Sequence, residues 1–142
     1  MEFNSCLDKQ EQIKKRFLSL KSQDERYQKI IELGQKAPKM TLEDQVEENL
    51  VPGCQSLLYL KIRCHEGKLS LQTSSDALIS AGLAQLLVET YNGEPPEAVF
   101  RCPPHFLKEI GLLESLSPSR ANGLKSLYQK LQKESLKFLV SK

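Results

Sequence analysis

Thiols and imidazoles are the side chains of this sequence with the most potential for chemistry. They stand at Cys6, Cys54, Cys64, Cys102, His65 and His105. No two cysteines have CxxC spacing, whereas structural zinc sites usually show close pairs of ligands. The sequence therefore predicts no metal centre. In a reducing compartment each thiol should be free, either as core filler or as a reactive nucleophile.

Cys54 has the position of a presented thiol. It lies between Gly53 and Gln55, at the end of a stretch of residues 35–56 that shows no helical or strand period. Loops of this length are uncommon inside compact domains and tend to be functional or disordered. Gly53 supplies backbone freedom for motion of the thiol. On position alone, the alternative is a small buried hydrophobe.

Length and composition indicate a globular protein. The chain has 142 residues, 39% of them hydrophobic and 27% charged, with a net charge of +2. We expect a single domain over residues 1–142. Clustered basic stripes are missing from most of the chain, so no nucleic-acid partner is expected. No apolar run is long enough to span a membrane, and the N-terminus lacks a secretory pattern, so we expect a cytoplasmic protein.

The hydrophobic pattern predicts an α+β fold. Helices are expected over residues 7–20, from a cap at Ser22 to a stop at Gly34, over residues 77–91, and from Pro118 onward. Alternation predicts two strands, residues 57–64 and 68–73, joined by a three-residue bulged turn that ends at Gly67. Residues 100–102 are a candidate for a third, brief strand. The sheet is therefore expected to be small and antiparallel, with about three strands.

Three positions within or beside these elements carry further expectations. The alternation of the first strand places Cys64 on the core side. Asp76, with the two serines before it, is expected to cap the helix of residues 77–91. That helix is apolar almost all round, so it should be buried. Gly82 in its interior suggests close approach to the sheet.

Arg120 has an unfavourable electrostatic position. It lies in the first turn of a helix that Ser117 caps and Pro118 opens. A cation there faces the positive end of the helix dipole, at a cost of about 0.3–1 kcal/mol. An anionic sulfur at Cys54 is one partner that would offset this cost. A solvated arginine is the alternative.

Four collinear blocks of the sequence resemble one known family, the SufE-like sulfur acceptors, which include the CsdE proteins. The blocks are residues 51–56 (VPGCQS), Tyr27 with residues 30–34, residues 75–77 with 82–83, and residues 116–120 with 122–124. Asn49 stands where the family pattern has an asparagine. The main departure is a tryptophan common on the family's first strand, which this chain lacks; Tyr59 is its nearest replacement.

The resemblance implies a fold and a role. The fold is a small antiparallel sheet flanked by helices, with the cysteine loop at one end. Such proteins take sulfur from a SufS/CsdA-type, pyridoxal-phosphate-dependent cysteine desulfurase onto Cys54. They stimulate that enzyme and pass the sulfur to downstream scaffold proteins of iron–sulfur cluster assembly. The chain itself should bind no cofactor and should not be an independent enzyme, because the pyridoxal phosphate belongs to the desulfurase.

Several residues are candidates for supporting roles at this site. Gly53, Gln55, Ser56 and Asn49 belong to the cysteine loop, whereas Asp76 and Arg120 are expected to face the partner or to favour the thiolate. Two other functions remain open at this point. One is a scaffold for a nascent iron–sulfur cluster, which would need about three or four converging thiolates. The other is an interaction module whose cysteine is incidental.

Overall fold

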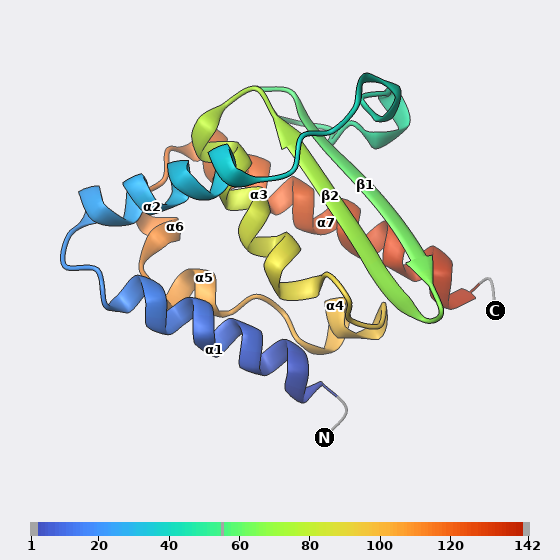
Figure 1. Ribbon diagram of the computed structural model, residues 1–142, viewed down its shortest axis with the longest axis horizontal. Helices are drawn as coiled ribbons and strands as arrows, with labels where there is room; N and C mark the ends of the chain where they lie inside the picture. Colours follow the sequence, from blue (N-terminus) through green and yellow to red (C-terminus); the bar gives the residue numbers. More distant parts are fainter. Residues whose placement is uncertain (1–2, 55, 141–142) are drawn as a thin grey trace.

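The computed structural model describes residues 3–54 and 56–140 (Figure 1). Helices dominate the chain, and a β-hairpin lies near its middle. In chain order the elements are α1 Asn4–Leu18, α2 Gln23–Lys36, η1 Leu42–Asp44, η2 Glu47–Asn49, β1 Leu58–His65, β2 Lys68–Ser75, α3 Leu78–Tyr91, α4 Glu97–Arg101, α5 Phe106–Glu109, α6 Leu112–Ser115 and α7 Pro118–Val140. Helix α1 therefore begins and ends earlier than predicted. None of the described helices is long and apolar enough to cross a bilayer.

The hairpin is the whole of the sheet in the described part of the chain. Strands β1 and β2 pair antiparallel, from Leu58 opposite Ser75 to His65 opposite Lys68. The predicted three-residue turn is wrong. Two residues make the turn, Glu66 at φ 52° and Gly67 at φ 78°. Two successive left-handed residues match the twist of the strands, so both strands continue to the turn without a bulge.

The α+β class with a small antiparallel sheet flanked by helices is confirmed, but the expected third strand is wrong. Residues 100–102 belong to the end of α4 and the position after it. The prolines Pro95 and Pro96 open that helix, and the Cys102 N–H donates to the Ala98 carbonyl at 2.9 Å. Ala98 and Val99 are fully buried, which fixes this short helix against the core.

Helix α3 is the central buried element, as its composition predicted. It packs against α2, β2 and α7 (Figure 1). Gly82, however, faces α2 and not the sheet: a Cβ at this position would lie 1.9 Å from the Ile30 carbonyl oxygen. Gly34 lies at the same contact, where an added Cβ would lie 2.9 Å from the Gly82 nitrogen. The predicted helix stop at Gly34 is therefore wrong, because this glycine serves close helix packing and α2 continues to Lys36.

Serine caps behave as their spacing predicted at two helices. The Ser22 hydroxyl accepts from the Glu25 N–H at 3.2 Å, and the Ser117 hydroxyl accepts from the Arg120 N–H at 3.4 Å. At α3 the prediction is wrong. Its N-cap is Ala77, without a side-chain cap, and the Asp76 carboxylate accepts from the Leu57 N–H at 3.0 Å. Asp76 thus ties the end of the hairpin to the cysteine loop.

Candidate functional site

The loop that carries Cys54 is closed at its base by the hairpin. The Val51 N–H donates to the Leu58 carbonyl at 2.8 Å, and Leu50 forms an isolated β-bridge with Tyr59. Both Val51 and Leu58 are buried in the core. The residues between them therefore form a short excursion from a fixed base, and Cys54 stands within it.

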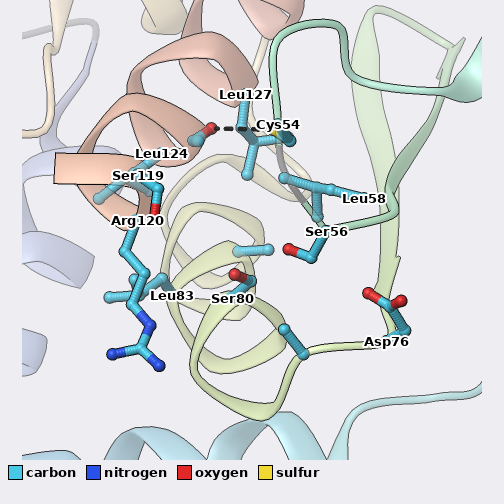
Figure 2. Close-up of a pocket in the computed structure, with 13 residues that line it drawn as sticks. Cys54, Ser56, Leu58, Asp76, Ser80, Leu83, Ser119, Arg120, Leu124 and Leu127 are labelled. Carbon is cyan, nitrogen blue, oxygen red and sulfur yellow. Dashed lines mark hydrogen bonds between the residues drawn. The ribbon is translucent and has the colours of Figure 1, made fainter. Parts of the chain in front are cut away.

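The backbone at Gly53 turns the loop toward α7. Gly53 has φ 79°, a left-handed conformation that favours glycine. The half-buried Cys54 then lies against α7, with its Sγ 3.9 Å from the Gly123 carbonyl oxygen (Figure 2). A Cβ on Gly123 would lie 3.5 Å from the same sulfur, so a glycine opposite the thiol leaves it space.

The thiol borders an open pocket of about 420 Å³ between the N-terminal parts of α3 and α7. The side of the pocket near the thiol is apolar, with Leu58, Leu124 and Leu127 (Figure 2). The opposite part carries serine hydroxyls and two charged side chains, Asp76 and Arg120. The pocket therefore shields the sulfur on one side and offers polar contacts at its mouth.

Burial favours the protonated form of the Cys54 thiol in this conformation. Removal from water raises the pKa of Cys54 above its ordinary value of 9.0. A thiol in such a place is protonated and weakly nucleophilic at neutral pH, because the thiolate is the reactive form. The sulfur is therefore protected while the loop lies against α7.

Arg120 and Asp76 both line the Cys54 pocket, on different sides of it. The Arg120 guanidinium points away from the sulfur in Figure 2, and burial alone accounts for the raised pKa of Cys54. The stabilisation of a thiolate by Arg120 thus stays a prediction, and it requires a different side-chain rotamer. The partner-facing role of Asp76 also stays a prediction.

The remaining predicted loop residues are placed differently. Ser56 lines the Cys54 pocket. Asn49 lies upstream, in η2, where its side chain donates to the Asp44 carbonyl at 2.8 Å and shapes the turn before the loop. Gln55 lies outside the described residues, so its predicted role is not addressed by the structure.

The other three cysteines lie away from this pocket. Cys6 and Cys102 are buried, at 0% and 2% exposure. Their surroundings are polar as well as apolar: the Gln10 side-chain amide donates to the Cys102 sulfur at 3.1 Å. Burial, together with the adjacent Cys102 thiol, raises the pKa of Cys6 strongly. Cys64 is half-buried and packs on the core, as its strand parity predicted.

Sequence reasoning did not assign a role to Gly123, Ser80 or Leu127, which the structure brings to the thiol pocket. Gly123 was within one of the blocks that carried the resemblance, and this was its only signal. Ser80 and Leu127 had no sequence signal for a role at this pocket, because helical periodicity predicts which side chains share a face but not which distant loop packs against that face. Among the described residues, no group of three or more His, Cys, Asp or Glu side chains is arranged to hold a metal ion.

Comparison with known proteins decides the family. Residues 11–135 match the SufE domain, described as an Fe-S metabolism associated domain. The chain belongs to the SufE family. This SufE-family chain is 34% identical over 113 residues to an uncharacterized SufE-like protein of Synechocystis sp., a match that covers 80% of this chain and 71% of that protein. An uncharacterized SufE-like protein of Rhizobium etli is 32% identical over 123 residues, which is 83% of each chain.

Two further relatives extend the comparison. SufE-like protein 1, chloroplastic/mitochondrial, of Arabidopsis thaliana is 32% identical over 129 residues; this is 90% of the SufE-family chain but only 35% of the plant protein. The solution structure of a hypothetical protein from Thermus thermophilus superimposes with a TM-score of 0.77 at 31% identity, over 93% of this chain and 96% of that one. The resemblance seen in the sequence motifs is therefore confirmed, and it places the protein in Fe–S metabolism.

Proposed function

We propose that the protein is a sulfur acceptor. It takes persulfide sulfur from a pyridoxal-phosphate-dependent cysteine desulfurase onto Cys54, stimulates that enzyme, and passes the sulfur on for iron–sulfur cluster assembly. The observation that carries the proposal is the placement of Cys54: a half-buried thiol on a short loop, at the edge of an open pocket. Cys6 and Cys102, in contrast, are buried in the core.

The transfer step is an exchange at sulfur. The Cys54 thiolate attacks the outer sulfur of the desulfurase cysteine persulfide, and a new S–S bond forms as the old one breaks. The electron pair of the broken bond stays on the desulfurase cysteine, which leaves as thiolate and takes up the proton that Cys54 lost. No electrons are gained or lost overall. The pyridoxal phosphate acts earlier, on the desulfurase, so this chain needs no cofactor for its step.

The loop would have two positions with different roles: one protects the Cys54 sulfur, and the other lets it react. Against α7, burial raises the pKa of Cys54 and keeps water and soluble thiols from one side of the sulfur. Moved outward, the thiol becomes hydrated, its pKa falls toward the ordinary value, and it reaches the partner's persulfide. The left-handed Gly53 next to it is a residue at which such a movement is sterically cheap.

Mass spectrometry of the intact protein tests the proposal. After incubation with a cysteine desulfurase and cysteine, the wild-type chain should gain the mass of one sulfur atom, which a reductant removes. Cys54→Ser should gain none and should not stimulate the desulfurase. Cys64→Ser is the matched control, because this half-buried cysteine lies off the loop, and it should behave as wild type.

Two results would contradict the proposal. One is a full sulfur gain in Cys54→Ser. The other is loss of desulfurase stimulation in a folded Cys6→Ser or Cys102→Ser protein, since these buried thiols should affect stability only. A cytoplasmic location and the absence of independent turnover are further parts of the proposal, and the same assay without the desulfurase tests the second of them.

A further inference from the structure

The two edges of the β-hairpin differ in what covers them. At the edge of β2, the Leu69 N–H donates to the Glu94 carbonyl at 2.8 Å, and the Leu69 carbonyl accepts from the Gly93 N–H at 2.7 Å. The Leu71 N–H donates to the Asn92 side-chain oxygen at 2.8 Å. The chain that follows α3 therefore covers the edge of β2 and satisfies its backbone groups.

The edge of β1 is covered only over its first residues. The Val51 N–H donates to the Leu58 carbonyl at 2.8 Å, so this carbonyl points away from β2. Successive residues of a paired strand direct their backbone groups alternately toward the partner strand and away from it. The N–H and C=O groups of Ile62 and Cys64 therefore also point away from β2.

The register of the hairpin agrees with this direction. Ile62 and Cys64 stand opposite Leu71 and Leu69, whose own backbone groups point to the far side of β2. Within residues 3–54 and 56–140, the outward groups of Ile62 and Cys64 have no hydrogen-bond partner. Figure 1 shows β1 as the outer strand, with no described strand beside the half that leads to the turn. This half of β1 is an open edge.

A groove of about 420 Å³ lies at the open edge. Residues 60–63 of β1 form one side of it, and Lys130, Glu134 and Lys137 of α7 line it as well. The segment of η1 and η2 contributes Asp44, Glu48 and Asn49. The groove shares no lining residue with the Cys54 pocket, so the two sites are separate.

The charges in the groove favour an acidic partner. Three of its four cationic side chains form ion pairs with Asp44 or Glu134. The fourth, Arg63, lies between Ile62 and Cys64, is exposed, and forms no ion pair with the described carboxylates. The third anion of the groove, Glu48, belongs to η2, which packs at the covered end of β1. The open edge therefore combines unpaired backbone groups with an unpaired guanidinium.

We propose that the open edge of β1 binds an extended, acidic segment of a partner protein, which joins the hairpin as a third strand. Main-chain hydrogen bonds to Ile62 and Cys64 provide the affinity, and a carboxylate beside Arg63 provides the selectivity. A second copy of this chain fits less well, because pairing of two such edges brings two Arg63 side chains together. This interaction goes beyond sulfur transfer and does not depend on it.

The test is amide hydrogen exchange of the native full-length chain, measured by NMR with a synthetic peptide as the probe. The peptide acetyl-Thr-Val-Glu-Val-Thr-Val-amide is extended and alternating, and it has one carboxylate. Without peptide, the Ile62 and Cys64 amides should exchange at least about tenfold faster than those of Lys61 and Arg63, which face β2. Millimolar peptide should slow exchange at Ile62 and Cys64 about tenfold and leave Lys61 and Arg63 unchanged.

Two kinds of control peptide separate backbone pairing from charge. N-methylation of alternate residues removes the donors of one edge of the peptide, so one of the two alternate patterns should abolish binding and the other should not. A peptide with lysine in place of glutamate should bind about fivefold more weakly, as expected for loss of one exposed ion pair. Equal binding by both methylated peptides, or by the lysine peptide, would contradict the proposal.

A charge reversal on the protein completes the test. Arg63→Glu should weaken the glutamate peptide by about fivefold and strengthen the lysine peptide. Lys133→Glu is the matched control, because this exposed lysine of α7 does not line the groove, and it should bind both peptides as wild type does.

Three results would overturn the proposal. The first is protection of the Ile62 and Cys64 amides in the chain alone, equal to that of Lys61 and Arg63. The second is protection without peptide that rises with protein concentration, since this would make a second copy the occupant of the edge. The third is an absence of any change at Ile62 and Cys64 with millimolar peptide. No step of the experiment uses a desulfurase or the Cys54 thiol, so failure here and failure of sulfur transfer are distinguishable.

Discussion

Substitution of Gly123 by alanine tests the contact between the Cys54 thiol and α7. Gly123 lies inside α7, where glycine is less favourable than alanine by about 1 kcal/mol. The new Cβ would lie 3.5 Å from the Cys54 sulfur, which is an ordinary van der Waals contact. We therefore expect the full helix-propensity gain to survive. For a chain of this size it corresponds to a rise in melting temperature of about 3 °C.

Gly82→Ala is the matched control, since it makes the same change inside another helix. There the added Cβ would lie 1.9 Å from the Ile30 carbonyl oxygen, a backbone atom that cannot rotate away. Helix α2 would have to move, and overpacking of this kind costs about 1–3 kcal/mol or more. The two variants should therefore shift stability in opposite directions, although intrinsic propensity favours alanine in both.

The assay combines thermal and urea unfolding with the rate of Cys54 alkylation. In Gly123→Ala the methyl group covers one side of the sulfur, so alkylation should slow while the melting temperature rises. A lower melting temperature would refute the contact distance on which the reasoning depends. Faster alkylation would show that the methyl group displaces the loop, and therefore that the space between the Cys54 sulfur and Gly123 is too small for a methyl group.

Three further predictions concern charge and pH at the same pocket. Arg120→Ala should slow persulfide transfer without lowering the melting temperature, since a cation in the first turn does not stabilise the helix; Arg120→Lys should restore only part of the rate, and a wild-type rate in Arg120→Ala would end the idea. Asp76→Arg should change desulfurase affinity in a binding titration more than it changes stability, although it also removes the bond to the Leu57 N–H; a change in stability alone would contradict a partner-facing role. Burial raises the pKa of Cys54 from 9.0, so its contribution to stability is present below that pH and is lost as the pH rises through the folded-state pKa. Urea unfolding between about pH 8 and 10 should therefore show a steeper alkaline loss for wild type than for Cys54→Ser, and equal slopes would count against burial of the thiol.

Local patterns in the sequence were sufficient for most elements and for the choice of Cys54 as the candidate thiol. The parity of β1, the serine cap at Ser22 and the apolar composition of α3 depend on neighbours a few residues away, so each could be recognised in the sequence itself. Cys54 became a candidate for the same reason, because glycine, cysteine and the following strand are adjacent in the chain, and the resemblance of residues 51–56 to the family motif supported the choice.

Contacts between distant segments were decided only by the tertiary structure. The expected strand near Phe100 is helical because Ala98 and Val99 are buried where α4 packs on α7. Asp76 was predicted as a helix cap, but its carboxylate instead accepts a hydrogen bond from the Leu57 N–H, at the end of the cysteine loop. Packing across the chain outweighs a local preference of this kind, which is worth about 1 kcal/mol.

The same distinction applies to the candidate site. The sequence suggested Cys54 as one possible partner of Arg120, and the structure shows that both line one pocket while the guanidinium points away from the sulfur (Figure 2). Gly123 faces the thiol from 69 residues along the chain, and Lys130 holds Glu48 from 82 residues away. A residue's type and spacing determine what chemistry it can perform, whereas its neighbours, and therefore the pKa and accessibility of its reactive atom, arise only when the chain has packed.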